Sequence, residues 1–107
     1  MKNIFSLENK VALITGAGGL LGPKHAEAII EFGGKVIMTD HHFDRVEFQA
    51  ERLNELYGEG SAVAYHMDVT DPVSIRKVVD TVERIDILIK IKTILYSYWN
   101  IKIKLNQ

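Results

Sequence analysis

Short apolar runs alternate with amphipathic segments through the first 89 residues of the chain. Four of these runs are rich in apolar and β-branched residues, as is typical of strands that are covered on both faces of a parallel sheet. The predicted strands span residues 11–15, 35–39, 61–67 and 85–89. The third run is less regular than the others because His66 lies within it.

Three segments between these runs place apolar residues on one face of a helix. The clearest begins at Asp71-Pro72, a pair that favours the N-cap and the first turn of a helix. Its apolar residues follow at helical spacing and are Ile75, Val78, Val79 and Val82. The second predicted helix spans residues 43–57, and the first contains Pro23 and ends at Gly33-Gly34.

This alternation of strands and helices predicts an α/β fold. Right-handed crossovers give a Rossmann-like parallel sheet of about four strands in the order 3-2-1-4, with helices on both faces. We expect an incomplete doubly wound domain over residues 1–89, followed by an atypical basic tail over residues 90–107. The fourth strand would have an open edge, which predicts low stability or self-association through that edge.

Charge is unevenly distributed along the chain. The formal net charge is −1, but the tail carries four lysines and no acid, so the other residues together carry −5. Neither value favours a nucleic-acid or membrane partner. The chain has no cysteine, no apolar stretch that fits a signal peptide, and no run near the ~20 apolar residues of a membrane span, so a cytoplasmic protein is expected.

A glycine cluster lies between the first predicted strand and the first predicted helix. Residues 15–22 read Thr-Gly-Ala-Gly-Gly-Leu-Leu-Gly. Such a turn brings bare backbone close to a phosphate, and the following helix offers free N–H groups. The residues predicted to bind a nucleotide diphosphate are Gly16, Gly18, Gly19, Leu20, Leu21 and Gly22. Alternatively, the glycines only allow the helix to pack closely on the strand.

Acidic residues end the second and third predicted strands, at the same edge of the sheet. Asp40 lies 24 residues after Gly16, close to the ~20 expected for a carboxylate that binds the adenosine ribose. This carboxylate would repel a 2′-phosphate, which favours NAD over NADP, with Arg45 as a weak counter-argument. The second group is Asp68-Val69. Asp40 could instead initiate a helix, and Asp68 could form a turn.

Together these motifs resemble the short-chain dehydrogenase/reductase family. Residues 7–16 are similar to the opening of that family, and residues 15–22 to its Thr-Gly-x-x-x-Gly-x-Gly turn. Asp68-Val69 resembles its adenine-contacting pair, and residues 86–89 resemble its fourth strand. The resemblance covers about residues 6–89 and implies hydride transfer between a nicotinamide cofactor and an alcohol or carbonyl.

Two departures from the family pattern lie within this range. Leu20 occupies a position that is usually glycine, and a positive φ there would cost about 1 kcal/mol or more and weaken cofactor binding. The joint at residues 83–85 is shorter than the family's glycine-bearing loop.

The catalytic residues of that family have no clear counterpart in this sequence. The resemblance implies a Ser and a Tyr-x-x-x-Lys pair beyond the fourth strand, in which Tyr exchanges a proton with the substrate and Lys lowers the pKa of that Tyr. Tyr98 and Lys102 match the spacing, but no serine stands at a suitable distance, so no catalytic residue is assigned. We expect a truncated or frame-shifted copy, and a catalytically inactive nucleotide-binding or self-associating module is the alternative to an enzyme.

Other kinds of site fit the sequence less well. A P-loop needs Ser or Thr after its lysine, and neither follows Lys24; a methyltransferase usually carries an acid where Thr15 stands. The histidines lack the spacing of metal ligands and are expected to face solvent, so no metal site is predicted. They are His25, His41, His42 and His66.

Overall fold

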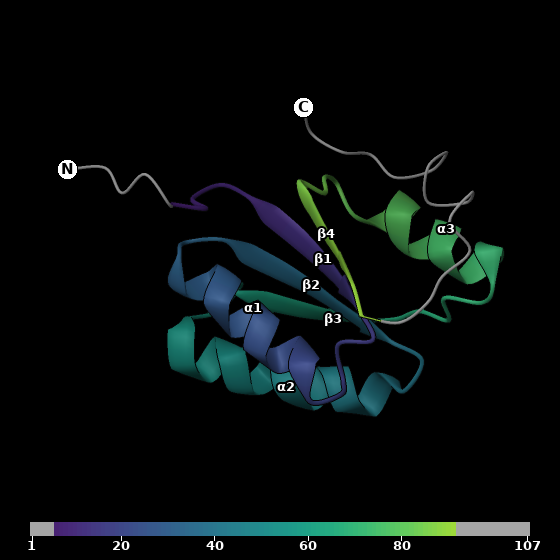
Figure 1. Cartoon of the computed structure of the whole chain (residues 1–107), viewed down its shortest axis with the longest axis horizontal. Helices are drawn as coiled ribbons and strands as arrows, with labels where there is room; N and C mark the ends of the chain where they lie inside the picture. The colour runs from purple at the N-terminus through teal and green to yellow at the C-terminus, as the bar shows by residue number, and fades with distance from the viewer. Residues whose placement is uncertain (1–5, 92–107) are drawn as a thin grey trace.

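The computed structural model describes residues 6–91, within which four strands alternate with three helices (Figure 1). The strands are β1 (Val11–Thr15), β2 (Lys35–Asp40), β3 (Ala62–His66) and β4 (Ile87–Lys90). The helices are α1 (Leu21–Glu31), α2 (Phe43–Tyr57) and α3 (Pro72–Thr81). The alternation that the apolar pattern predicted is therefore confirmed.

All four strands run parallel in one sheet, in the order β3-β2-β1-β4. In the register of the sheet, Leu13 of β1 lies between Ile37 of β2 and Leu88 of β4. On the other side of β2, Asp40 lies opposite His66 of β3. The predicted order 3-2-1-4 is confirmed. The carboxyl ends of the strands meet at one edge, which is where doubly wound sheets bind ligands.

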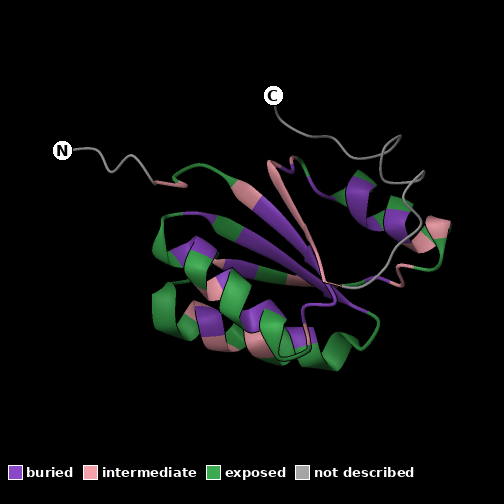
Figure 2. Ribbon diagram, in the orientation of Figure 1, coloured by how far each residue is buried: buried purple, intermediate pink, exposed green. Residues whose placement is uncertain are grey.

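Helices cover both faces of the sheet, as predicted (Figure 1). On one face, α1 and α2 enclose a core that includes Ile14, Met38 and Leu53. On the other face, α3 packs over a second core that includes Leu13 and Met67. Successive residues of a strand point to opposite faces, so Leu13 and Ile14 are both fully buried, in different cores. Figure 2 shows this burial along the central strands.

β1 and α2 have the predicted bounds, whereas the bounds of β2, β3 and β4 differ from the predicted ones by one or two residues. β4 begins at Ile87 rather than at residue 85, because Asp86 pairs with Val11 through its side chain as well as its backbone. The Val11 amide donates to Asp86 Oδ2, and the Asp86 amide donates to the Val11 carbonyl, both at 2.8 Å. Val82 is buried as predicted, but it caps the end of α3 instead of lying within the helix.

Leu20 does not carry the strained backbone that was considered for its position. Its φ is −72° and its ψ is −37°, which are ordinary right-handed helical values, and its side chain is 90% exposed. The positive φ in this turn belongs to Gly16, at +63°. Since strain requires a positive φ at a residue with a side chain, Leu20 adds no such cost.

Within residues 6–91, β4 has β1 as its single hydrogen-bonded neighbour strand. All four residues of β4 are half-buried, whereas the middle of β1 is fully buried. Self-association through this edge and the low stability that was expected from it stay predictions, as does the division of the chain at residue 89.

Candidate nucleotide site

Backbone hydrogen bonds hold the turn between β1 and α1 against the end of β2. The Ala17 amide donates to the Thr39 carbonyl at 2.9 Å, and the Gly19 amide donates to the Gly16 carbonyl at 3.5 Å. The Thr39 hydroxyl donates to the carbonyl of Ile14 at 3.0 Å. These bonds fix the path of the turn across the carboxyl edge of the sheet.

Asp40 connects the glycine turn to the start of α2. Its Oδ2 accepts a hydrogen bond from the Gly18 amide, and its Oδ1 accepts one from the His42 amide, each at 2.9 Å. The residue is only 3% exposed. Hydrogen bonds from two amides hold the carboxylate in one orientation beside the turn. The N-cap of α2 is His42, so Asp40 does not hold the helix-capping position that was considered for it.

Two glycines of the turn lie where a side chain would not fit. A Cβ on Gly18 would stand 2.7 Å from the Cβ of Arg45, and a Cβ on Gly22 would stand 2.3 Å from the Ala17 carbonyl oxygen. By contrast, the nearest atom to a Cβ on Gly19 is 3.8 Å away. Close packing therefore leaves no room for a side chain at Gly18 or Gly22, while Gly19 is exposed.

The first turn of α1 has no side chain that caps its amides. Leu20 is the N-cap residue and makes no side-chain capping bond, and the first turn contains no acid. Helix α1 starts at Leu21, and Pro23 in its first turn has no N–H to donate. Uncapped amides and the positive end of the helix dipole together attract an anion at this position.

Asp68 is held in a tight loop between β3 and α3. Its Oδ1 accepts hydrogen bonds from the Thr70 amide at 2.9 Å and from the Thr70 hydroxyl at 2.6 Å. The Asp68 amide donates to Ser74 Oγ at 2.8 Å. The bonds from the Thr70 hydroxyl and amide lower the pKa of Asp68; burial opposes this effect, and the charges of His41 and His66 add to it. The turn-forming role that was considered for Asp68 is therefore present.

A cavity of about 310 Å³ opens at the carboxyl edge of the sheet. Its lining brings together part of the glycine turn and the predicted Asp68-Val69 pair. The lining residues are Gly16, His41, Met67, Asp68, Val69 and Thr70. The volume is at the lower end of the range for small-molecule sites. The other predicted residues of the site do not line this cavity; Asp40 adjoins it through its carbonyl, which accepts a bond from the Met67 amide at 3.0 Å.

Three residues of this lining were not predicted from the sequence: His41, Met67 and Thr70. Each lies at or just after the carboxyl end of β2 or β3, so the position after a predicted strand was the available signal. His41 was expected only to face solvent. It is exposed, as are His25, His42 and His66, but it also forms part of the cavity wall.

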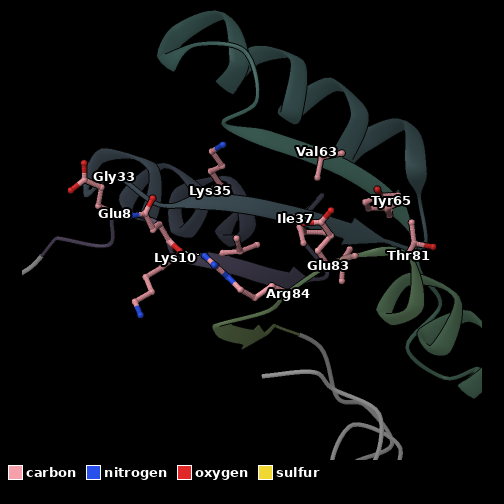
Figure 3. A pocket seen from close by; sticks show the side chains of 13 residues that line it. Glu8, Lys10, Gly33, Lys35, Ile37, Val63, Tyr65, Thr81, Glu83 and Arg84 are labelled. Carbon is pink, nitrogen blue, oxygen red and sulfur yellow. Dashed lines mark hydrogen bonds between the residues drawn. The ribbon is translucent and has the colours of Figure 1, made fainter. Parts of the chain in front are cut away.

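A larger cavity, of about 540 Å³, lies at the opposite, amino end of the sheet (Figure 3). Ile37, Val63 and Tyr65 form its apolar wall. Arg84 also lines it, donating to the Asn9 carbonyl and pairing with Asp86. None of the predicted nucleotide-binding residues contributes to this lining, so the larger cavity is separate from the candidate nucleotide site.

Within residues 6–91, no three His, Asp or Glu side chains gather into a group that could hold a metal ion. No helix in the same range is long and apolar enough to cross a membrane. Tyr98 and Lys102, together with the rest of the tail from residue 92, lie outside the described residues.

The sequence model of the family described as short chain dehydrogenase matches residues 10–98 of the chain. This range includes the glycine turn, Asp40 and the Asp68-Val69 pair, which the structure places at one edge of the sheet. The chain belongs to the short-chain dehydrogenase family. The match continues nine residues beyond residue 89, where the resemblance was expected to end.

Two curated relatives are similar over most of the chain but are much longer than it. The peroxisomal hydratase-dehydrogenase-epimerase of Saccharomyces cerevisiae is 39% identical over 105 residues, which cover 94% of this chain and 11% of that protein. Sorbose reductase SOU1 of Candida albicans is 38% identical over 82 residues, which cover 77% of this chain and 28% of that protein. The chain therefore spans less than a third of the length of either relative.

Solved structures with each type of dinucleotide share the fold. An oxidoreductase from Haemophilus influenza with bound NAD has a TM-score of 0.71 and 31% identity, over 78% of this chain and 30% of that chain. The RhlG–NADP complex of Pseudomonas aeruginosa has a TM-score of 0.73 and 25% identity, over 92% of this chain and 40% of that chain. The family uses NAD or NADP, and this chain contains its NAD(P)-binding region.

Proposed function

We propose that this chain binds NAD at the carboxyl edge of its sheet, with residues 16–22 around the diphosphate and Asp40 at the adenosine ribose. The observation that carries this proposal is the hydrogen bond from the Gly18 amide to Asp40 Oδ2. This bond holds a carboxylate beside the turn that we propose for the diphosphate, and the ribose is the group next to the diphosphate in the dinucleotide. A carboxylate oxygen can accept more than one hydrogen bond, so the bond to Gly18 is compatible with binding a ribose hydroxyl.

The adenine ring is assigned to the cavity of about 310 Å³. Val69 supplies an apolar surface there, and Asp68 is an acceptor for the exocyclic amine of adenine. Hydrogen bonds from Thr70 hold the Asp68 carboxylate in place and favour its ionised form. Both residues that the sequence assigned to adenine therefore border one cavity together with Gly16.

The preference for NAD over NADP rests on Asp40. The 2′-phosphate of NADP projects from the same ribose and would bring like charges together beside a nearly buried carboxylate, which is unfavourable. Arg45 is the opposing influence, because it belongs to the first turn of α2 and its Cβ packs against Gly18. We assign the larger effect to Asp40 because its carboxylate is fixed by two amides.

Hydride transfer between the nicotinamide and an alcohol or carbonyl is the chemistry that such a site serves in a complete enzyme. The sequence has no clear counterpart of the Ser and the Tyr-x-x-x-Lys pair that this chemistry uses in the family. A nucleotide-binding module without catalysis is therefore the second candidate. Oxidation of NADH with a panel of carbonyl compounds, followed by absorbance, separates the two: turnover supports the enzyme, and binding without turnover supports the module.

Calorimetric titration of the full chain with NAD tests the binding proposal. We expect saturable binding, and a rise in the melting midpoint, since NAD would bind only the folded form. Asp40→Ala should weaken NAD binding at least about tenfold, the equivalent of about 1.4 kcal/mol. Asp80→Ala is the matched control, because it removes the same charge from an exposed position on α3.

Absence of NAD binding by the wild-type chain would refute the proposal outright. Equal affinities of wild type and Asp40→Ala would refute the ribose assignment alone. Circular dichroism of each variant shows whether Asp40→Ala keeps the fold, since this change removes both hydrogen bonds that the carboxylate accepts.

A further inference from the structure

A groove lies between helix α2 and strand β3, at one edge of the sheet. In the described part of the chain β3 is the last strand on this side, and β2 is its hydrogen-bonded neighbour. The groove has a volume of about 270 Å³, and β3 contributes Ala62, Val63 and Ala64 to its lining. An edge strand presents backbone amides and carbonyls that can pair with another strand.

Hydrogen bonds beside both ends of β3 show which of its backbone groups face this groove. The Ser61 carbonyl accepts a bond from the Val36 amide, and the Met67 amide donates to the Asp40 carbonyl, both at 3.0 Å. The odd-numbered residues therefore direct their backbone groups toward β2. Because this direction alternates along a strand, the even-numbered residues face outward. They are Ala62, Ala64 and His66.

The side chain of Asn54 already pairs with the first of these residues. Its Nδ2 donates to the Ala62 carbonyl, and its Oδ1 accepts from the Ala62 amide, both at 2.9 Å. A carboxamide offers the same donor and acceptor as a peptide group, so Asn54 bonds to β3 in the way that a neighbouring strand would. The next outward-facing residue, Ala64, is half-buried and offers a second pair of backbone groups at the same edge.

The hollows on the two faces of β3 differ in chemistry. Three exposed carboxylates line the groove beside α2, those of Glu47, Glu51 and Glu59. On the other face, Val63 and Tyr65 belong to the apolar wall of the cavity of about 540 Å³ (Figure 3). The charged residues of that cavity are of both signs, so its apolar wall distinguishes it from the groove. Val63 borders both spaces.

We propose that the edge of β3 binds an extended peptide segment of a partner protein, in which basic and apolar side chains alternate. Successive side chains of a strand point to opposite faces. The basic ones would therefore meet the carboxylates of Glu47 and Glu51, and the apolar ones would meet Val63 and Tyr65. Backbone bonds to Ala64 and His66 would add the segment to the sheet as a further strand.

Charge makes this surface selective. The carboxylates in the groove attract lysine or arginine and repel a segment that carries acids at the same positions. The backbone bonds themselves do not depend on sequence, so the choice of partner depends on these side chains. Binding of such a segment requires no dinucleotide, and it is therefore independent of the proposed NAD site.

An NMR titration of the full chain with the peptide acetyl-Val-Lys-Val-Lys-Val-amide tests this assignment. We expect saturable binding and slower hydrogen exchange at the Ala64 amide. The Val63 amide faces β2 and should exchange as before. A matched peptide with glutamate in place of lysine should bind at least about tenfold more weakly, because its charges repel those of the groove.

Charge reversal in the groove gives a second, independent test. Glu47→Lys/Glu51→Lys should bind the glutamate peptide more tightly than the lysine peptide. The matched control is Glu31→Lys/Asp80→Lys, which reverses two charges at exposed positions on α1 and α3 and should keep the wild-type preference. A gain of binding for the glutamate peptide cannot result from unfolding of the variant.

A preference for the lysine peptide with slower exchange at Ala64, reversed only in the groove variant, supports the assignment. Equal affinities for the two peptides refute the role of the carboxylates. Binding without slower exchange at Ala64 refutes strand addition. No binding refutes the site: the acids then only shield the edge, or, if the Ala64 amide exchanges slowly without peptide, the chain or a second copy covers it. NAD binding, measured separately, is unaffected by each of these results.

Discussion

Asp40 and Gly18 are 22 positions apart in the chain, yet the amide of Gly18 donates directly to the carboxylate of Asp40 at 2.9 Å. The bond makes the glycine turn and the acidic end of β2 one structural unit. A change at either residue should therefore be felt at both the diphosphate and the ribose positions. A side chain would clash at Gly18 but would fit at Gly19, and this difference gives a direct test.

Gly18→Ala should destabilise the chain by about 1–3 kcal/mol and weaken NAD binding. The added Cβ would stand 2.7 Å from the Cβ of Arg45 and 3.1 Å from Asp40 Oδ2, so the turn must shift. Gly19→Ala is the matched control, because its Cβ meets nothing closer than 3.8 Å. Urea denaturation gives the stability of each variant. Equal losses for the two variants would show that the turn is not packed against Arg45.

Gly22→Ala should cost more than Gly18→Ala, about 3 kcal/mol or above. Its Cβ would stand 2.3 Å from the backbone carbonyl oxygen of Ala17, and backbone cannot rotate away as a flexible side chain can. Gly60→Ala serves as a comparison: its φ is +88° but nothing lies within 4 Å, so only the backbone strain of about 1 kcal/mol applies. Thermal melting of the two variants ranks them, and a smaller loss for Gly22→Ala would contradict the close contact between α1 and the turn at Ala17.

Thr70→Val should raise the pKa of Asp68 toward its ordinary value of 3.8, because it removes the hydroxyl bond that is the main cause of the lowering. A carboxyl whose pKa is lower in the folded state stabilises the fold fully above the unfolded value. This stabilisation is lost as the pH falls below 3.8 and through the lower folded pKa. Thr70→Ser keeps the hydroxyl and should keep the lowered pKa. NMR titration of the Asp68 carboxyl carbon measures this pKa in the wild type and in both variants. Identical pKa values in all three proteins would contradict the role of the Thr70 hydroxyl.

Asn54→Leu should destabilise the chain by about 2 kcal/mol. The side-chain amide of Asn54 donates to the Ala62 carbonyl, and its oxygen accepts from the Ala62 amide, both at 2.9 Å. Ala62 is buried, so losing these partners leaves two backbone groups unsatisfied at the start of β3. Glu55→Leu changes an exposed neighbour on the same helix and should have little effect. Hydrogen exchange at the Ala62 amide should accelerate only in Asn54→Leu.

The sequence allowed the elements and their order to be predicted because both depend on local pattern. Buried parallel strands read as continuous apolar runs, and Asp71 does accept the capping bond from the Val73 amide at 3.0 Å that its position suggested. The first residue of β4 was predicted wrongly because the Asp86 side chain accepts a hydrogen bond from the backbone amide of Val11, 75 residues away. The apolar pattern along the chain gives no information about a side chain that bonds to a backbone amide so distant in the sequence.

The candidate site was predictable in its parts but not in their arrangement. The glycine turn, Asp40 and Asp68 stood out because each follows a predicted strand. The proximity of His41 to His66 was not visible, since it depends on how the ends of β2 and β3 align in the sheet. The backbone conformation of Leu20 could not be predicted either, because a position that is usually glycine in the family need not have a positive φ.

The cavity of about 540 Å³ that Arg84 lines offers a place where this domain could be stabilised by mutation. It lies where β1 and β2 begin, whereas the nucleotide would bind where they end. Val63 is 43% exposed there, on β3, which is an edge strand of the described sheet. Larger aliphatic side chains could fill this space and strengthen the fold without touching cofactor recognition. Stability can thus be changed at one end of the sheet without altering the residues proposed to bind the cofactor at the other end.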